Sequence, residues 1–337
     1  MSSDRYSRQK LFAPIGEEGQ RKLSEKHVLV VGAGALGTSS AEQLVRAGIG
    51  KLTIVDRDYV EMSNLQRQQL FTEADALERM PKAIAAGKRL SEINPLVTVD
   101  ARIMDVQREE LELFISDVNV VLDATDNFET RMLINDMAQK YQVPWIYGGC
   151  VGSHGLSFTI LPGVTPCLNC LMDTVPLSGA TCDTVGVISP AVQMVTAHQV
   201  TEAMKILVED MDSLHHKFIT FDLWNHQYSG FKVNQVKKDD CPSCGKDPDY
   251  PYLSAGYQTK AAVLCGRDTV QLRPPIKERN LDELRKQLHE GIVEQNPFLL
   301  SYTNGNQRLV FFKDGRVLIH GTKDIAEAKS MYHKIVG

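Results

Sequence analysis

Three features that mark whole classes of protein are missing from this sequence. No stretch of its 337 residues holds the roughly eighteen successive apolar residues that a membrane-spanning helix needs. An excess of basic residues is also missing: the net charge is -5, which argues against a nucleic acid or an anionic membrane as partner. The opening residues Met1 to Tyr6 lack the basic segment and following apolar run of a secretory signal peptide, so we expect a cytoplasmic protein.

The cysteine count is seven, an odd number that does not suit a framework of disulfides. In a chain expected in the cytoplasm, such cysteines favour metal ligation or reactive thiols. Hydrophobic residues make up 43% and charged residues 23%, so the composition is that of an ordinary globular protein. The length exceeds that of a typical single domain and predicts a main domain with a smaller one attached.

Strand-like and helix-like segments alternate through the first part of the chain. Strands are predicted at 27–31, 51–56, 97–101 and 118–123, and helices at 38–47, 81–93, 109–115 and 130–141. Consecutive parallel strands must be joined by a connection that crosses over the sheet, and the predicted helices can form these crossovers. The order therefore predicts an α/β fold with a doubly wound, mostly parallel, Rossmann-like sheet.

The pattern changes beyond residue 141. Shorter strands at 145–147 and 156–161 precede a Gly/Ser/Thr-rich stretch, 177–186, which predicts an exposed loop. A helix at 190–208 and strands at 217–221 and 230–236 then complete a first domain that spans 1–245.

A segment with two prolines and two aspartates, 246–260, predicts a linker. Beyond it, 261–337 predicts a small α+β domain of unknown role. Helices are expected there at 281–290 and 325–335, and strands at 298–302, 308–312 and 316–320. The dipeptides Asn304-Gly305 and Asp314-Gly315 separate these strands and favour tight hairpin turns.

A glycine-rich turn links the strand at 27–31 to the helix that follows it. Gly32, Gly34 and Gly37 have the spacing of the dinucleotide fingerprint, and Asp56 ends the next strand, where it could accept hydrogen bonds from ribose hydroxyls. Glycines there permit a tight turn and a close approach of phosphate to backbone amides. The turn alone fits NAD as well as ATP, and a turn that only packs helix on strand is the alternative.

Several charged residues favour ATP over NAD. A helix starting at Ser63 would place Asn64 and Arg67 on one face, and Lys82 stands at a predicted helix start, although each also fits a solvated surface. Asp126 follows an apolar strand, at the sheet edge where ligands bind in such folds, and is well placed to hold Mg2+. Attack on an α-phosphate needs a metal and cations to absorb charge, whereas hydride transfer needs neither.

Two CxxC pairs, Cys167 with Cys170 and Cys241 with Cys244, predict one closed four-thiolate zinc site. About seventy residues separate the pairs, so the ion would tie the end of the domain to its middle. Redox pairs of the thioredoxin kind are the alternative. We disfavour them because neither pair is predicted to open a helix after a suitable strand.

A further cysteine, Cys182, lies in the predicted loop 177–186 and outside both pairs. Its position suits a nucleophile, and an inert loop thiol is the alternative.

Together these motifs resemble the MoeB/ThiF family, whose enzymes adenylylate ubiquitin-like sulfur carriers. The resemblance covers approximately residues 4–245. It rests on Tyr6-Ser7-Arg8-Gln9, the glycine turn, Asp56, Ser63 to Gln68, Pro81-Lys82, Asp123 to Asn127 and the paired cysteines.

For the nucleotide, the resemblance implies that Asp56 holds the ribose of ATP. It implies that the phosphates are bound by Asn64, Arg67 and Lys82, and the magnesium by Asp126.

The resemblance also implies a homodimer, in which Arg8 contacts the ATP phosphates from the partner subunit. In thiazole-forming members of the family, a cysteine at the position of Cys182 can bond covalently to the carrier during sulfur transfer. In molybdopterin-type members that cysteine is dispensable for adenylylation.

These observations predict ATP-dependent adenylylation of the C-terminal glycine carboxylate of a small sulfur carrier, of the ThiS or MoaD type, with release of pyrophosphate. The residues expected to carry the chemistry are Arg67, Lys82, Asp126 and Cys182. The Cys182 loop favours thiamin thiazole synthesis over molybdopterin synthesis, and a sulfur donor such as a cysteine desulfurase is a further expected partner. The alternatives are an NAD-dependent dehydrogenase, for which no hydride-transfer residue stands out, and a non-catalytic scaffold that docks a carrier.

Overall fold

The computed structural model describes residues 5–172, 185–254, 261–263, 268–274, 278–288, 291–305 and 307–336. The chain forms two compact units, Met1–Tyr257 and Gln258–Gly337. Among the described helices, none combines the length and the apolar character that crossing a membrane requires.

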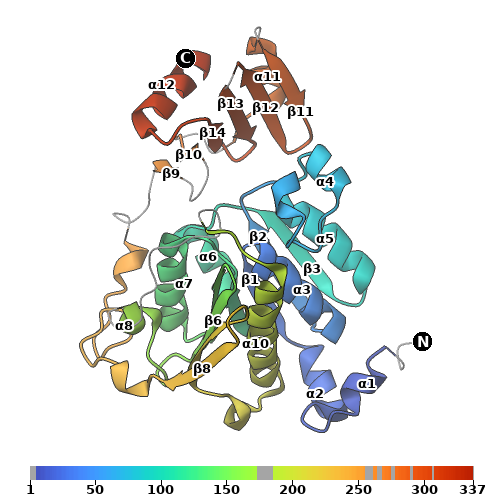
Figure 1. The fold of residues 1–337 in the computed structure, drawn as a ribbon, viewed down its shortest axis with the longest axis vertical. Coiled ribbons are helices and arrows are strands. Elements are labelled where there is room, and N and C mark those ends of the chain that lie inside the picture. The colour runs from blue at the N-terminus through green and yellow to red at the C-terminus, as the bar shows by residue number, and fades with distance from the viewer. Residues whose placement is uncertain are drawn as a thin grey trace. The chain divides into compact units, whose positions relative to one another are not determined.

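An eight-stranded sheet forms the centre of the first unit (Figure 1). Its spatial order is β3 (Thr98–Ile103), β2 (Lys51–Asp56), β1 (His27–Val31), β4 (Val120–Asp123), β5 (Trp145–Val151), β6 (His154–Ile160), β7 (Lys217–Asp222) and β8 (Gln227–Lys232). Neighbours from β3 to β5 pair in parallel, and those from β5 to β8 pair antiparallel. The predicted α/β fold is confirmed. The strand order reverses between β1 and β4, which is where such sheets bind ligands.

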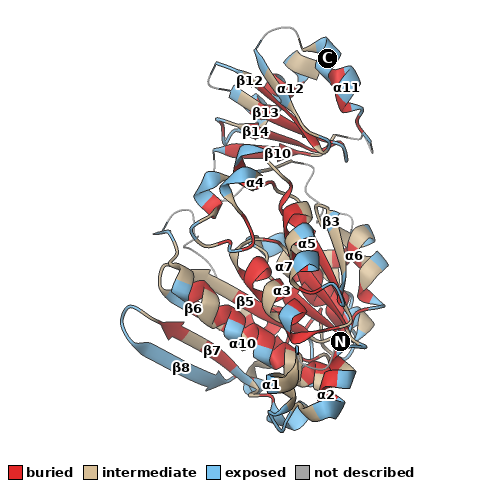
Figure 2. Ribbon diagram, turned by 90° about the vertical axis from the view of Figure 1, so that its right-hand side faces the viewer, coloured by how far each residue is buried: buried red, intermediate tan, exposed pale blue. Residues whose placement is uncertain are grey.

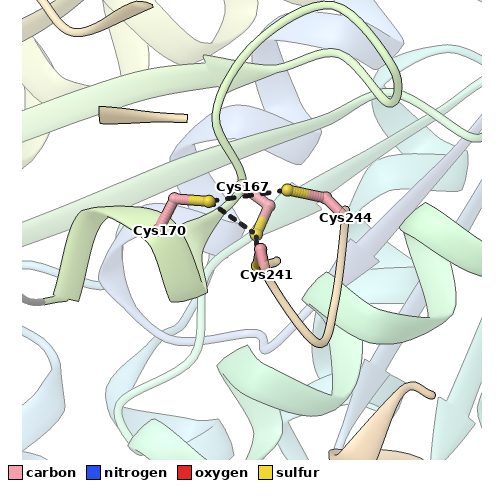
Figure 3. Close-up of side chains that lie close together, drawn as sticks. All are labelled: Cys167, Cys170, Cys241 and Cys244. Atoms are coloured by element: carbon pink, nitrogen blue, oxygen red, sulfur yellow. Dashed lines mark hydrogen bonds between the residues drawn. The ribbon is translucent and has the colours of Figure 1, made fainter. Parts of the chain in front are cut away.

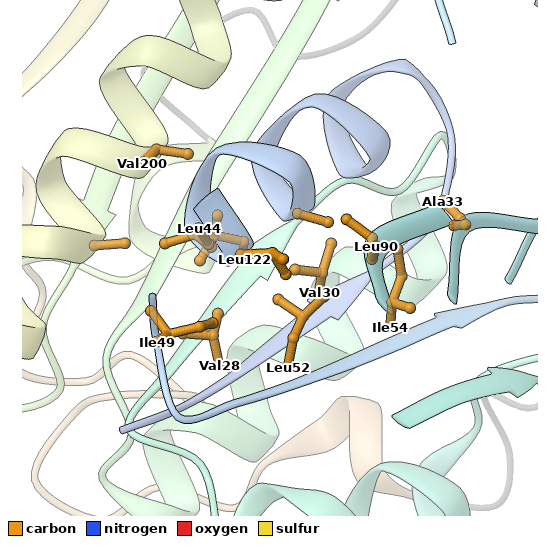
Figure 4. Packing of buried hydrophobic residues seen from close by; sticks show 14 of the residues in the cluster. Val28, Val30, Ala33, Leu44, Ile49, Leu52, Ile54, Leu90, Leu122 and Val200 are labelled. Atoms are coloured by element: carbon orange, nitrogen blue, oxygen red, sulfur yellow. The ribbon is translucent and has the colours of Figure 1, made fainter. Parts of the chain in front are cut away.

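Helices cover both faces of this sheet (Figure 1). One face is covered by α2 (Gly16–Leu23), α3 (Ala35–Ala47), α5 (Lys82–Ile93) and α10 (Ser189–Val208), and the other by α6 (Arg108–Ile115), α7 (Phe128–Tyr141) and α8 (Leu168–Met172). Strand β1 shows why: Val30 packs into the first layer, Leu29 into the second, and every residue of the strand is buried. Figure 4 shows Val30 near Leu44 of α3 and Leu90 of α5. A continuous apolar run is what a strand buried on both faces needs.

The sheet ends differently from the predicted strand at 230–236. Strand β8 spans Gln227–Lys232, and η3 (Asn234–Val236) is a 3-10 helix. The register of the β7–β8 pair explains the difference, because it joins Asp222 to Gln227 and Lys217 to Lys232. An edge strand has only one partner, so β8 cannot continue past the start of β7.

The described part of the first unit also contains the short elements α1 (Ser7–Lys10), η1 (Met62–Asn64), α4 (Glu73–Leu77) and η2 (Met211–Ser213). Of the predicted linker 246–260, residues 246–254 are described. They include η4 (Pro251–Leu253), whose Leu253 is buried in the core of the first unit.

The second unit contains a six-stranded antiparallel sheet. Its order is β11 (Ile292–Gln295), β12 (Leu299–Asn304), β13 (Gln307–Phe312), β14 (Val317–His320), β10 (Thr269–Leu272) and β9 (Ala261–Val263). The helices α11 (Leu281–Gln287) and α12 (Ile325–Val336) contribute Leu284 and Met331 to a core with Phe311, and Figure 2 shows the buried residues along β12 to β14. Gly305 and Gly315 have positive φ, as tight turns favour. Strands β9 to β11, which are three or four residues long, were not predicted from the sequence.

Candidate nucleotide and metal sites

The glycine turn lies at the end of β1, beside the point where the strand order reverses. Gly32 has φ +102°, and a Cβ atom there would press on the carbonyl oxygen of Ala124. A Cβ atom on Gly37, in the first turns of α3, would overlap the carbonyl oxygen of Gly32. Gly34 is different, because nothing lies within 4 Å of the Cβ position there. Two glycines thus permit close packing, and the third leaves open space before the N-terminus of α3, where a phosphate is favoured.

Asp56 ends β2 and is hydrogen-bonded to this turn. Its Oδ2 accepts from the Ala33 amide at 2.6 Å, and its Oδ1 accepts from the Asp58 amide at 2.6 Å. Burial raises the pKa of Asp56 above its ordinary value, while the ammonium of Lys82 opposes that rise. The structure therefore brings together the glycine turn and the acidic residue that the fingerprint predicted. Each carboxylate oxygen has a second lone pair, so Asp56 can still accept hydrogen bonds from ribose hydroxyls.

Lys82 is the first residue of α5 and is buried, with 4% of its surface exposed. Its Nζ lies 3.4 Å from Oδ2 of Asp58, and its amide donates to the Asp58 carbonyl at 2.9 Å. Since the Asp58 amide is bonded to Asp56, these residues form one cluster beside the glycine turn. The alternative of a solvated lysine is wrong. A buried cation near the open turn is suited to bind phosphate.

The segment around Asn64 differs from the helix predicted to begin at Ser63. A 3-10 helix, η1, spans Met62–Asn64, and Asn64 is buried, with its Oδ1 accepting from the Glu61 amide at 3.0 Å. The Glu61 side chain accepts in return from the Asn64 amide. This reciprocal cap begins a helical turn at Met62, one residue before the predicted start, and that turn extends only to Asn64. Arg67 is half-buried, and its Nη1 donates to the Ser63 carbonyl at 2.9 Å.

Asp126 follows β4 and presents an exposed carboxylate, 75% of whose side chain is accessible. An arginine that the sequence analysis did not single out, Arg57, lies 3.8 Å from Oδ1 of Asp126 and 3.3 Å from Oδ1 of Asp105. Burial alone would lower the pKa of Arg57, but the surrounding carboxylates, Asp105 first, raise it overall. One accessible carboxylate suits Mg2+, which usually keeps waters and takes phosphate oxygens as its other ligands.

The loop that carries Asp126 is fixed by a second arginine that was missed. Asp123 is fully buried, and Nε of Arg131 donates to its Oδ2 at 3.0 Å. A second nitrogen of Arg131 donates to the Thr125 carbonyl at 2.8 Å. A buried carboxylate needs a hydrogen-bonded or charged partner. The apolar run before Asp123 predicts that its carboxylate is buried, and this signal could have indicated a nearby cation.

Arg8 is exposed on α1, which is held at the far end of α3 from the glycine turn. The side-chain amide of Gln9 donates to the carbonyl of Ala47, the last residue of α3, at 2.9 Å. Helix α3 has 13 residues. It is therefore about 20 Å long. The structure thus does not bring Arg8 to the turn at Gly34 within one chain.

Four buried or partly buried cysteines form a cluster (Figure 3). The Sγ atoms of Cys167 and Cys241 are 3.6 Å apart, those of Cys170 and Cys244 are 3.5 Å apart, and all four lie within 4.8 Å of one another. Zinc–sulfur bonds in a tetrahedral site imply sulfur separations of about 3.8 Å. The Cys167 thiol lowers the pKa of Cys170 to about 7. The structure therefore brings together the predicted ligands in a geometry that fits zinc.

One argument against redox pairs needs correction, because Cys167 directly precedes α8 and its pair does open a short helix. The distances still disfavour two separate pairs. The Sγ of Cys167 lies 3.6 Å from Cys241 and 3.9 Å from Cys170 in its own motif. All of these separations exceed the roughly 2.05 Å of a disulfide. The fifth cysteine of interest, Cys182, lies outside the described residues.

Comparison with known proteins gives a consistent result. The model of the "ThiF family" matches residues 6–243. A protein of Bacillus subtilis (strain 168), "Sulfur carrier protein ThiS adenylyltransferase", is 54% identical over 337 residues and is covered to 99%, as is this chain. A protein of the same name from Escherichia coli (strain K12) is 35% identical, over 72% of this chain and 94% of its own.

The fold is also similar to that of a solved structure. The crystal structure of E. coli MccB with succinimide superimposes with a TM-score of 0.63 at 21% identity, over 72% of this chain and 75% of that one. The resemblance inferred from the motifs is confirmed by the family match and by the relatives. The chain belongs to the ThiF family.

Proposed function

We propose that this protein uses ATP to adenylylate the C-terminal glycine carboxylate of a ThiS-type sulfur carrier. The observation that carries the proposal is the buried Lys82 cluster beside the open Gly34, at the reversal point of the sheet. The name of the B. subtilis relative supports the thiamin branch.

In the proposed reaction a carboxylate oxygen of the carrier attacks the α-phosphorus of ATP. The bond between that phosphorus and the bridging oxygen breaks, and pyrophosphate leaves with the electron pair. The N-terminus of α3 and the ammonium of Lys82 would stabilise the growing negative charge, and Arg67 would bind a phosphate after releasing Ser63. Magnesium held by Asp126 would neutralise the phosphate oxygens.

The direct product is an acyl-adenylate on the carrier. Incubation of the protein with ATP, magnesium and a purified ThiS-type carrier should give a carrier whose intact mass has increased by one adenylyl group. A carrier that remains unmodified, while a MoaD-type carrier is adenylylated, would refute the thiamin assignment. A covalent adduct between carrier and enzyme that is lost in Cys182→Ser would support the predicted role of that thiol.

The glycines give a prediction that separates folding from nucleotide binding. Gly34→Ala should shift the melting temperature by less than about 3 °C but weaken ATP binding about tenfold, because the new methyl group fills space reserved for phosphate. Gly37→Ala should lower the melting temperature by at least about 5 °C, because its methyl group meets the Gly32 carbonyl. Calorimetric titration and thermal unfolding measure both. Unchanged ATP binding in Gly34→Ala would place the phosphates elsewhere.

We propose that two chains complete each other's sites in a homodimer. Arg8 lies the length of α3 away from the glycine turn of its own chain. This position suits a role in the nucleotide site of a partner subunit. Next to Arg8, the large apolar side chains of Leu11 and Phe12 are 73% and 60% exposed, as is usual for residues that a partner covers.

Mixing two inactive variants tests this shared site. Arg8→Ala and Lys82→Met should each be inactive, but in a mixture half of the dimers would regain one intact site, restoring roughly a quarter of the parental activity. Adenylylation is measured before and after subunit exchange. A mixture that stays inactive although exchange is shown by mass would contradict the proposal.

We also propose that the four cysteines bind one structural zinc ion. The sulfur geometry and the closed set of four thiolates support this role, because no ligand position is left for a substrate.

A further inference from the structure

We propose that Asn135 and Asp136, two adjacent residues of α7, form a clip that positions both CxxC segments for the metal. The first loop, 167–170, leads into α8, and the second loop is 241–244. This inference rests on the proposed zinc site. Both side chains are fully buried, with 0% of each residue exposed, although neither is a metal ligand. Buried amide and carboxyl groups destabilise a fold unless hydrogen bonds satisfy them. The hydrogen-bond partners of Asn135 and Asp136 therefore indicate the role of these two side chains.

Asn135 holds the first loop. Its Oδ1 accepts from the amide of Leu168 at 2.8 Å, and Leu168 stands between the two cysteines of that loop. Its Nδ2 donates to Oδ1 of Asp136 at 3.2 Å. The backbone of the first loop is thus tied to α7 at the position next to Cys167.

Asp136 holds the second loop. It accepts a hydrogen bond from the hydroxyl of Ser243, which is fully buried between Cys241 and Cys244. Its Oδ2 also accepts from the Tyr252 amide at 2.9 Å, which fixes the chain just beyond that loop.

A bond between the two loops closes the network. Nδ2 of Asn169, in the first loop, donates to Oγ of Ser243 at 3.3 Å and lies 3.9 Å from Sγ of Cys241. An N–H group directed at a sulfur stabilises the thiolate that a metal requires. The network therefore runs from one loop to the other and from both loops to one helix.

The physical advantage of such a clip is preorganisation. The paired cysteines are 74 positions apart, so the metal must otherwise restrict two independent segments of chain. Segments already fixed to α7 lose less conformational entropy when the metal binds. Outer partners of metal ligands typically change metal affinity by roughly 10–100-fold.

Competition against a chromophoric zinc chelator, with the full-length protein, tests this role. Asn135→Leu and Asp136→Leu should each weaken zinc binding by roughly 10–100-fold. Asp136→Asn retains one of the two acceptor oxygens and should weaken zinc binding less than Asp136→Leu does. The same proteins loaded with cobalt should show a distorted visible spectrum only for the leucine variants.

Gln139 provides a matched control. It is a buried polar residue one turn further along α7, and its Nε2 has no hydrogen-bond partner in the described chain. Gln139→Leu should therefore bind zinc within about twofold of the parent. Equal weakening in this variant would overturn the clip, because any buried change in α7 would then have the same effect.

Ser243→Ala removes a hydrogen bond of the clip from the second loop and leaves α7 unchanged. It therefore tests the clip even if a leucine variant is insoluble. It should weaken zinc binding about tenfold. Parental zinc affinity in Ser243→Ala and in the soluble leucine variants would overturn the clip while leaving the zinc site intact. A parent protein that binds no zinc would instead overturn the proposed zinc site.

Discussion

Replacing Lys82 with methionine is expected to lower the rate of carrier-dependent ATP–pyrophosphate exchange by roughly 100–1,000-fold. Lys82 is a buried cation in the cluster beside the glycine turn, bonded to Asp58, which is in turn bonded to Asp56. Methionine keeps most of the side-chain volume but supplies no charge to the phosphates or to the two carboxylates. NAD binding for hydride transfer would not need this cation.

Lys88→Met is the matched control, because Lys88 lies on the same helix and is exposed. Its exchange rate should stay within about twofold of the parent, as expected for a surface change. Circular dichroism should show that both variants are folded. A folded Lys82→Met protein with parental exchange would remove Lys82 from the nucleotide site.

Replacing Cys241 with serine is expected to abolish stoichiometric zinc binding and to lower the melting temperature by at least about 10 °C. Cys241 is buried, and its sulfur lies 3.6 Å from that of Cys167, which belongs to the other CxxC pair. The second loop would lose its metal link to the middle of the domain. Elemental analysis of the purified protein and thermal unfolding measure the two effects.

Cys150→Ala tests whether the effect belongs to the cluster. Cys150 is half-buried on β5 and is not one of the four clustered cysteines. This variant should retain about one zinc ion per chain, as one four-thiolate site requires. If Cys241→Ser melts at the parental temperature, or the parent contains no zinc, the proposed structural role fails.

Much of the fold could be predicted because its signals are local. The apolar run His27–Val31 is a strand from end to end, since its side chains enter two cores. The glycine spacing that follows it predicted the tight turn, because Gly32 and Gly37 must each approach a backbone carbonyl closely. The two CxxC pairs predicted one shared zinc site, with redox pairs as the alternative, and the structure clusters all four cysteines.

The remaining features depend on contacts between distant segments. Arg57 contacts Asp105 and Asp126 only because β2, β3 and β4 end at the same edge of the sheet, and no spacing in the sequence shows this. Similarly, the pattern of α7 does not show that Asn135 reaches the loop of Leu168. The helix expected at Ser63 is replaced by the short η1, which begins at Met62 behind the cap formed by Glu61 and ends at Asn64.

Carrier-dependent ATP–pyrophosphate exchange tests the central proposal most directly. With ATP, magnesium and a purified ThiS-type carrier, labelled pyrophosphate should enter ATP, and removal of the carrier's terminal glycine or the change Asp126→Ala should stop the exchange. Exchange that persists without the carrier, or that is absent with every small sulfur carrier of the same cell, would contradict the proposed adenylylation.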